Sequence, residues 1–172
     1  MTDSVVLVGF MGAGKTTVGR LLARALGLSL VDTDELIEAR FGPIADLFAT
    51  RGEGGFRDLE REVVVAELEV ARAEPRVLSL GGGAVTIDDV RQALGRLPHV
   101  VWLDAPLDVL FRRASADAGT RPLACDEAVF ETLYGQRAPL YRAIATVVVR
   151  DSGNEGPGRL AQRVLSAVAA RA

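Results

Sequence analysis

Short runs of apolar residues alternate along the chain with longer segments in which apolar residues recur every three or four positions. Five of these runs are short and apolar enough to be buried strands. They cover residues 5–9, 28–31, 77–80, 99–104 and 145–149. Continuously apolar strands that are separated by helices are typical of a parallel sheet covered on both faces. The pattern therefore predicts an α/β fold with a parallel sheet and helices on both sides of it.

The segments between the strands predict helices, both from their apolar spacing and from the signals at their ends. The expected helices cover residues 15–26, 34–40, 44–50, 52–73, 87–96, 126–137 and 158–170, and one more starts at Pro106. Thr86 and Asp89 are spaced as a capping pair. The last helix carries one apolar stripe, which favours packing on the sheet over a partner surface. Residues 114–126 show no periodicity and are the best loop candidate.

The composition is that of a globular protein and narrows the classes of partner. Of the 172 residues, 49% are apolar and 25% are charged, which fits one domain with one core. A net charge of −3 argues against nucleic acid as the main partner. No apolar run has the length of a membrane span, and no targeting segment is evident. Cys125 is the only cysteine, so an internal disulfide is impossible and a reducing cytoplasm is the expected compartment.

A glycine-rich loop follows the first strand and precedes the first helix. Residues 9–16 read GFMGAGKT, which satisfies the phosphate-binding pattern G-x-x-x-x-G-K-[ST] in the required strand–loop–helix context. The glycines let several backbone N–H groups point into one concavity, and the helix N-terminus adds its dipole. Lys15, the only lysine of the chain, can bridge phosphate oxygens, and Thr16 offers a hydroxyl to Mg²⁺. The loop predicts an ATP or GTP site without specifying the reaction.

A second oxygen ligand for Mg²⁺ usually comes from an aspartate at the end of a strand. Two apolar runs end in this way, at Asp32 and at Asp104. Asp104 precedes Ala105-Pro106 and is better interpreted as a helix-start residue. Asp32 begins the stretch Asp32-Thr33-Asp34, whose two carboxylates suit a metal and an attacking hydroxyl, although Asp32 can also cap the following helix. Both interpretations of Asp32 stay open at this stage.

Three further features indicate an acceptor site and a lid. Gly81-Gly82-Gly83 follows a strand directly and exposes backbone N–H groups at the same edge of the sheet. Arg57 and Arg137 taken singly are typical surface residues, but an anionic acceptor would give both a role, because arginine binds carboxylates bidentately. Arg121 lies in the loop over residues 114–126, which can close over a nucleotide and exclude water.

These stretches together resemble the shikimate kinase family over nearly the whole chain. The matching motifs are GFMGAGKTT, VDTD, IADLFATRGEGGFRDLE, VLSLGGGAV, RPL and QRAPLY, in the order of the family and close to its spacing. The resemblance implies phosphorylation of the 3-hydroxyl of shikimate by ATP, with Mg²⁺. It also implies a three-layer P-loop kinase fold with five parallel strands in the order 2-3-1-4-5 and a mobile lid.

The resemblance further implies roles for individual residues. The catalytic residues would be Lys15, Asp34 and Arg121, and the metal ligands Thr16 and Asp32. ATP would be bound by Gly12, Ala13, Gly14, Lys15, Thr16, Thr17, Arg113 and Arg121. Shikimate would be bound by Asp34, Arg57, Gly81, Gly82, Gly83 and Arg137. The whole chain, 1–172, would be one P-loop kinase domain, with the lid at 114–126 and the shikimate-binding region at 32–62.

Three alternative functions are compared with this prediction. Another small-molecule kinase, for gluconate or a nucleoside monophosphate, is the alternative within the same fold. A GTPase switch is disfavoured because a guanine-specific N-K-x-D motif would need a second lysine. An ATPase domain of a larger machine has only the pair Asp34-Glu35 in its favour. We therefore expect a cytoplasmic enzyme, a monomer as is common in the family, that acts on shikimate and ATP and involves neither nucleic acid nor a membrane.

Overall fold

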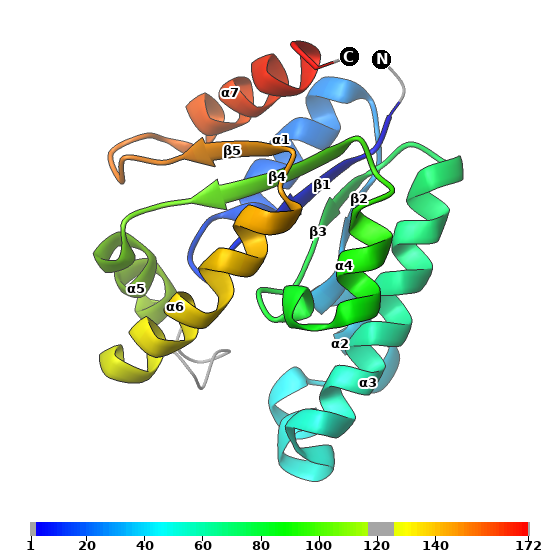
Figure 1. Cartoon of the computed structure of the whole chain (residues 1–172), viewed down its shortest axis with the longest axis vertical. Coiled ribbons are helices and arrows are strands. Elements are labelled where there is room, and N and C mark those ends of the chain that lie inside the picture. Colours follow the sequence, from blue (N-terminus) through cyan, green and yellow to red (C-terminus); the bar gives the residue numbers. More distant parts are fainter. Residues whose placement is uncertain (1–2, 117–125, 172) are drawn as a thin grey trace.

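A five-stranded parallel sheet forms the centre of the structure, a computed structural model that describes residues 3–116 and 126–171. Its strands are β1 (Val5–Val8), β2 (Leu30–Asp32), β3 (Val77–Ser79), β4 (His99–Asp104) and β5 (Val147–Arg150). Every neighbouring pair is parallel and the order is β2-β3-β1-β4-β5 (Figure 1). The predicted fold class and strand order are both confirmed. The apolar runs located β4 at its full length, whereas β2 and β5 begin two residues later than expected.

Helices cover both faces of this sheet, which gives three layers (Figure 1). Their bounds are α1 (Lys15–Leu26), α2 (Thr33–Phe41), α3 (Ile44–Ala73), α4 (Asp88–Leu94), α5 (Leu107–Ala116), α6 (Glu127–Ile144) and α7 (Pro157–Ala169), with a 3₁₀ turn η1 (Ala84–Thr86). α1 and α7 pack together on one face, and α3, α4 and α6 lie on the other. The apolar stripe of α7 is buried, so the expectation that it packs on the sheet is confirmed.

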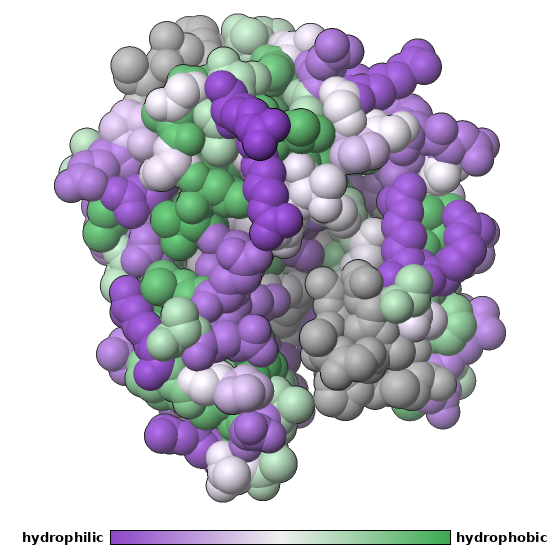
Figure 2. Space-filling model, turned by 180° about the vertical axis from the view of Figure 1, so that it is seen from behind, coloured by the Kyte–Doolittle hydropathy of each residue, from purple (hydrophilic) through white to green (hydrophobic). Residues whose placement is uncertain are grey.

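Two hydrophobic clusters divide the interior. The larger one surrounds β1 and β4, whose side chains are almost fully buried from both sides. The smaller one consists of Ile37, Leu47, Phe56, Leu59 and Val63 and joins α2 to the first half of α3. These two segments form a lobe beside the carboxyl ends of the strands, and Figure 2 shows the surface hollowed next to it. The lobe therefore has its own small core.

Helix ends follow the local chemistry of the sequence. Gly27 ends α1 in the left-handed conformation, with φ of 66°, which is the conformation that favours glycine at this position. The Asp32 side chain caps α2 by accepting hydrogen bonds from the N–H groups of Asp34 and Glu35, at 3.0 and 3.3 Å. The expected break at Gly42–Pro43 separates α2 from α3. Within α3 only Gly52 is non-helical, at φ 68° and ψ 177°, so the two expected helices meet at this single residue.

Two predictions about helices are wrong. Thr86 and Asp89 do not form a capping pair: the Thr86 hydroxyl donates to the Gly83 carbonyl at 2.8 Å, while Asp89 pairs with Arg61. α6 does not end at residue 137 but continues through Pro139 to Ile144. Proline lacks the N–H that a helix interior uses, which disfavours this continuation. Pro139 itself is exposed, and the helix continues with Arg137 and Tyr141 buried on another face.

The lid expectation is tested only at its ends. Residues 114–116 belong to α5 rather than to a loop, and Asp126 caps α6. Arg121 and Cys125 lie outside the described residues. In the described ranges, no helix combines the length and apolar character that crossing a bilayer requires.

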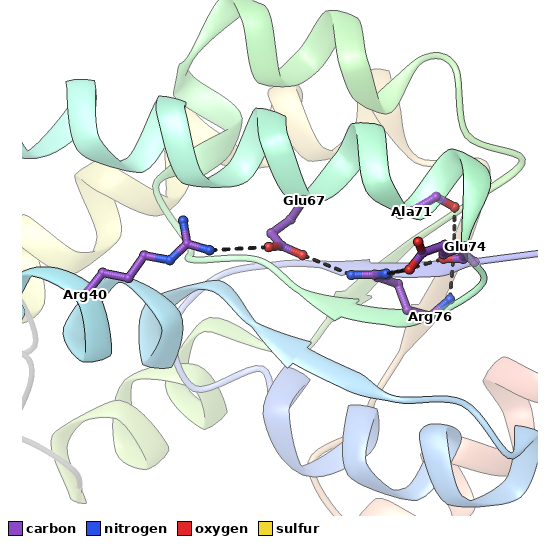
Figure 3. A network of polar contacts seen from close by, with 6 residues as sticks. Arg40, Glu67, Ala71, Glu74 and Arg76 are labelled. Carbon is purple, nitrogen blue, oxygen red and sulfur yellow. Dashed lines mark hydrogen bonds and ion pairs between the residues drawn. The ribbon is translucent and has the colours of Figure 1, made fainter.

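A polar network ties α2 and α3 to the amino edge of the sheet (Figure 3). Glu67 of α3 pairs with Arg76 at 3.2 Å and with Arg40 of α2 at 3.8 Å. Arg76 directly precedes β3, and its N–H donates to the Ser4 hydroxyl at 3.0 Å. The Ser4 hydroxyl in turn donates to the Ala71 carbonyl at 2.6 Å. This network lies at the opposite edge of the sheet from the phosphate loop, so it stabilises the fold without contacting the candidate site.

Replacing Ser4 with alanine should therefore lower stability and leave catalysis intact. The change leaves a buried carbonyl and a largely buried N–H without partners, a loss of about 1–3 kcal/mol. Urea unfolding should show this decrease in the free energy of unfolding, with unchanged Michaelis constants. Ser166→Ala, on the exposed face of α7, is the matched control and should not lower stability.

Candidate functional site

The phosphate loop wraps tightly between the ends of β1 and α1. Gly12 has φ of 82°, and a Cβ atom there would lie 2.3 Å from the Leu110 carbonyl oxygen, so only glycine fits. Gly14, at φ 80°, starts α1 and has free space around it. The ammonium of Lys15 curls back over the loop and donates to the carbonyls of Gly9 and Phe10 at 2.8 and 3.1 Å. The loop backbone and the ammonium thus form one concave positive surface.

Two cavities meet at this loop. The first has a volume of 370 Å³ and is lined by residues 12–18, by Arg113 and by Pro157. The second has a volume of 310 Å³, and its walls include Asp34, Arg57, Gly82, Gly83 and Arg137. Lys15 and Thr16 line both cavities. A group bound in one cavity can therefore reach a group bound in the other only beside these two side chains.

A hydrogen bond joins the phosphate loop to the start of α2. The Thr16 hydroxyl donates to Asp32 Oδ2 at 2.6 Å, while Asp32 Oδ1 accepts the capping N–H groups of α2. The capping interpretation of Asp32 is therefore confirmed, and its other carboxylate oxygen lies beside the Thr16 hydroxyl. Two neighbouring oxygen ligands suit Mg²⁺, which commonly takes few protein ligands and completes its shell with phosphate and water. Within residues 3–116 and 126–171, no group of three or more His, Cys, Asp or Glu side chains forms a metal cluster.

Asp104, the other strand-end aspartate, is used differently. Its carboxylate accepts the Tyr134 hydroxyl at 2.9 Å and lies 3.6 Å from the Arg150 side chain. Together with burial, this contact raises the pKa of Tyr134 to about 12. The carboxylate links α6 to the end of β5 and lines neither cavity. Of the two candidates, only Asp32 reaches the phosphate loop.

Arg57 and Glu60 form an ion pair in the wall of the second cavity. The Arg57 guanidinium donates to Glu60, whose side chain is only 2% exposed, and also pairs with Glu53 at 3.4 Å. Burial raises the pKa of the Glu60 carboxyl, against the opposing effect of the Arg57 charge. Glu60 thus orients the Arg57 guanidinium, although burying the Glu60 carboxylate is itself unfavourable.

Arg137 enters the same cavity from the opposite side, on α6. It is only 5% exposed, and its guanidinium lies over the Phe10 ring at 5.6 Å from the centroid. Burial lowers the pKa of Arg137, and the nearby charge of Arg57 lowers it further. Two cations lining one cavity, one of them strongly desolvated, favour an anionic ligand that accepts from both.

The glycine triple provides space for these side chains. A Cβ atom at Gly81 would lie 2.4 Å from an Asp34 carboxylate oxygen, and one at Gly83 would lie 2.1 Å from an Arg57 nitrogen. Gly82 and Gly83 line the second cavity, whereas Gly81 packs behind it and donates its N–H to Thr33 at 3.0 Å. The triple is therefore needed for close approach as well as for exposed N–H groups.

The first cavity has one ion pair that the sequence did not indicate. Arg113 lies 2.7 Å from Asp151, which is 4% exposed and also accepts the Gly153 N–H at 2.8 Å. This pair connects the end of α5 to the loop over residues 151–156, whose Glu155 also lines the cavity. Glu60 and Asp151 were both missed, because an isolated acid in a sequence gives no sign of its burial. The one signal that could have indicated Glu60 is its spacing of three residues from Arg57 on the same helix. No such signal existed for Asp151.

The raised pKa of Glu60 predicts how stability changes with pH in a Glu60→Gln variant. Since the folded-state pKa exceeds 4.5, the contribution of Glu60 is fully present below about 4.5 and is lost as pH rises through the folded-state pKa. The variant has no carboxyl group at residue 60, so it lacks this pH-dependent loss of stability. Its free energy of unfolding, relative to wild type, should therefore increase from pH 4 upward and then level off.

Urea unfolding at closely spaced pH values between 4 and 8 measures this difference directly. Glu62→Gln, which alters an exposed carboxylate on the same helix, is the control. A difference for Glu60→Gln that stays constant or falls with pH would contradict the raised pKa.

Comparison with known proteins agrees with this geometry. The family model described as shikimate kinase matches residues 11–169. The shikimate kinase of Mycobacterium tuberculosis strain H37Ra is 46% identical over 170 residues, which cover 96% of this chain and 93% of that protein. A solved shikimate kinase from Acinetobacter baumannii, in complex with shikimate, superposes with a TM-score of 0.89 at 38% identity, covering 99% of this chain and 94% of that one.

A gluconokinase from Sinorhizobium meliloti has the same fold but is more distant. It superposes with a TM-score of 0.66 at 20% identity, covering 98% of this chain and 93% of that one, so it shows the fold alone. The family model spans residues 11–169, and the Mycobacterium tuberculosis relative aligns over 96% of this chain. The chain belongs to the shikimate kinase family.

Proposed function

We propose that the protein transfers the γ-phosphoryl group of ATP to the 3-hydroxyl of shikimate, giving shikimate 3-phosphate and ADP. The observation that carries this proposal is that Lys15 and Thr16 line both cavities. A triphosphate on the loop in the first cavity would end where an alcohol in the second cavity begins. Membership of the shikimate kinase family and the complex of the Acinetobacter relative with shikimate support the identity of that alcohol.

The first cavity would hold ATP. The N–H groups of residues 12–17 and the α1 N-terminus would bind the phosphates, and Lys15 would turn from the loop carbonyls toward the β- and γ-phosphates. Arg113, which is held by Asp151, would lie beside the adenine base of ATP together with Pro157. Arg121, from the proposed lid, would add positive charge at the transferred phosphoryl group. Such charge stabilises the phosphoryl oxygens in the transition state.

Thr16 and Asp32 would hold Mg²⁺, since their oxygens adjoin each other at the junction of the cavities. When bound, the ion supplies charge neutralisation at the β- and γ-phosphate oxygens. The Thr16 hydroxyl would then release its hydrogen bond to Asp32 and present its oxygen to the ion. Asp32 keeps its capping contact through the other oxygen, so α2 stays anchored in both states.

The second cavity would hold shikimate. Arg57 and Arg137 would bind its carboxylate, which accepts from both guanidinium groups at once. Asp34 would hydrogen-bond the 3-hydroxyl, orient it toward the γ-phosphate and accept its proton as the new bond forms. The N–H groups of Gly82 and Gly83 would bind remaining acceptor oxygens, while Gly81 acts from behind by leaving space for Asp34.

The whole chain would act as one P-loop kinase domain, with a shikimate-binding region over about 32–62. It would work as a cytoplasmic monomer, without nucleic acid or a membrane. The net charge of −3 supports the exclusion of nucleic acid as a partner.

A panel of acceptors tests the proposed reaction. ADP release is measured with shikimate, gluconate, AMP, CMP or no acceptor, each with ATP and Mg²⁺. We expect fast release with shikimate and slow release in every other reaction. Fast release without acceptor would instead indicate an ATPase, and faster release with gluconate or a nucleotide would indicate the alternative kinases.

Replacing Gly83 with alanine should weaken shikimate binding with little effect on folding. The added methyl group would occupy the position of the Arg57 guanidinium, which is the flexible end of a side chain and can move away. Losing a charge-assisted hydrogen bond of about 1.5–3 kcal/mol should raise the Michaelis constant for shikimate about tenfold or more. The constant for ATP should stay within about twofold, because the loop is untouched.

Gly135→Ala on α6 is the matched control, since a methyl group there would meet no atom within 4 Å. Steady-state kinetics with each substrate varied in turn separate the two constants. Equal effects of Gly83→Ala on both constants would show that the proposed position of Arg57 is wrong.

A further inference from the structure

The hydrogen bonds of the glycine turn are almost all made by its carbonyl groups. The Gly81 carbonyl accepts the Ala84 N–H at 3.1 Å, and the Gly83 carbonyl accepts the Thr86 N–H at 2.9 Å. The Gly82 carbonyl accepts the Tyr141 hydroxyl. Within the described ranges, no hydrogen bond uses the N–H groups of Gly82 and Gly83, and both residues line the second cavity. These two N–H groups are the donors that the turn presents to a ligand.

The Gly82–Gly83 peptide group needs a hydrogen-bond partner outside the turn to keep its orientation. Glycine has no Cβ atom, so a peptide between two glycines turns over more readily than any other. The peptide group is planar and trans, so the Gly82 carbonyl and the Gly83 N–H point in opposite directions. A group that holds this carbonyl toward the core therefore aims the N–H outward, into the cavity that Gly83 lines.

Tyr141 is such a group and is itself rigidly held. Its side chain is fully buried, and its ring stacks on Trp102 with centroids 5.8 Å apart. Burial raises the pKa of Tyr141, so its hydroxyl keeps the proton that it donates. Arg137 lies one turn earlier on the same helix and lines the cavity. One face of α6 thus supports two donors, the Arg137 guanidinium directly and the Gly83 N–H through Tyr141.

Gly83 lies next to Arg57. A Cβ atom at Gly83 would overlap the Arg57 guanidinium in its present position. A carboxylate bound by that guanidinium is therefore within reach of the Gly83 N–H as well. Tyr141 itself lines neither cavity, so its hydroxyl acts on a ligand only through the turn.

We propose that Tyr141 is a positioning residue for the acceptor: its hydroxyl holds the Gly82 carbonyl and thereby aims the Gly83 N–H at the acceptor's carboxylate. This inference rests on the proposed function, because it takes shikimate as the acceptor. It assigns a role in acceptor affinity to a buried side chain that touches neither substrate.

Tyr141→Phe tests the inference by removing one oxygen atom. The Michaelis constant for shikimate should rise about three- to tenfold, as expected for one aligned hydrogen bond, while kcat and the constant for ATP stay within about twofold. Calorimetric titration with shikimate should show the same loss of affinity. A merely structural role would lower stability while leaving both Michaelis constants unchanged or altering both alike, and that result would overturn the proposal.

Two matched variants separate the hydrogen bond from helix stability and ring packing. Tyr134→Phe removes a hydroxyl from the same helix, where it bonds Asp104, and should leave the shikimate constant unchanged. Trp102→Phe alters the packing of Tyr141 but keeps its hydroxyl, and should also leave that constant nearly unchanged. A rise with Trp102→Phe equal to that with Tyr141→Phe would assign the effect to packing and overturn the proposal.

A measurement on the wild-type protein keeps the inference testable if Tyr141→Phe does not fold. In protein labelled with ¹⁵N-glycine, the amide signal of Gly83 is identified by its loss in Gly83→Ala. Shikimate should move this signal to higher proton frequency, as a new hydrogen bond does, and an unmoved signal would contradict the proposal.

Shikimate-dependent ADP release by the wild type is recorded alongside. Its absence would refute the proposed function, whereas its presence with an unmoved Gly83 signal would refute the positioning role alone.

Discussion

The hydrogen bond between Thr16 and Asp32 is the constraint on which the arrangement of the site depends. It joins the first turn of α1, which follows the phosphate loop, to the first residue before α2, which begins the lobe. Asp32 uses its second oxygen to cap α2, so the direction of that helix is set at the same carboxylate. Asp34, two residues on, lines the second cavity. One carboxylate thus fixes the distance between a phosphate-binding loop and an acceptor-binding helix.

Charge is distributed unequally between the two sides of this junction. The first cavity is lined by the phosphate loop, with its backbone N–H groups and the Lys15 ammonium, and by Arg113, which is paired with Asp151. The second contains two arginines, one buried beneath the Phe10 ring and the other paired with buried Glu60. Desolvated charges are unfavourable without partners, so this wall is fully compensated only when an anion is bound. In the proposed function, acceptor specificity would therefore come from the lobe and α6 rather than from the phosphate loop.

The sequence predicted the parts of the molecule that periodicity and short motifs encode. Apolar runs located all five strands, and the glycine loop, Asp32, Asp34 and both arginines lie where the motifs placed them relative to the sheet edge. The ends of elements were less predictable, because an edge strand such as β2 gains hydrogen bonds from one side only. The helix expected over 126–137 continues to Ile144. That error hid Tyr141, which lies beyond the expected end and meets the glycine turn only through the fold.

Lys15 shows how the loop constrains residue type as well as charge. Its ammonium reaches two carbonyls of its own loop, five and six residues back, so the stem must curl inside a turn with little space. At Gly12, a single added Cβ atom would already overlap the backbone of α5. A planar guanidinium is wider than an ammonium and needs partners arranged as a fork. All the remaining basic residues of the chain are arginines, and steric confinement within the loop accounts for the one lysine.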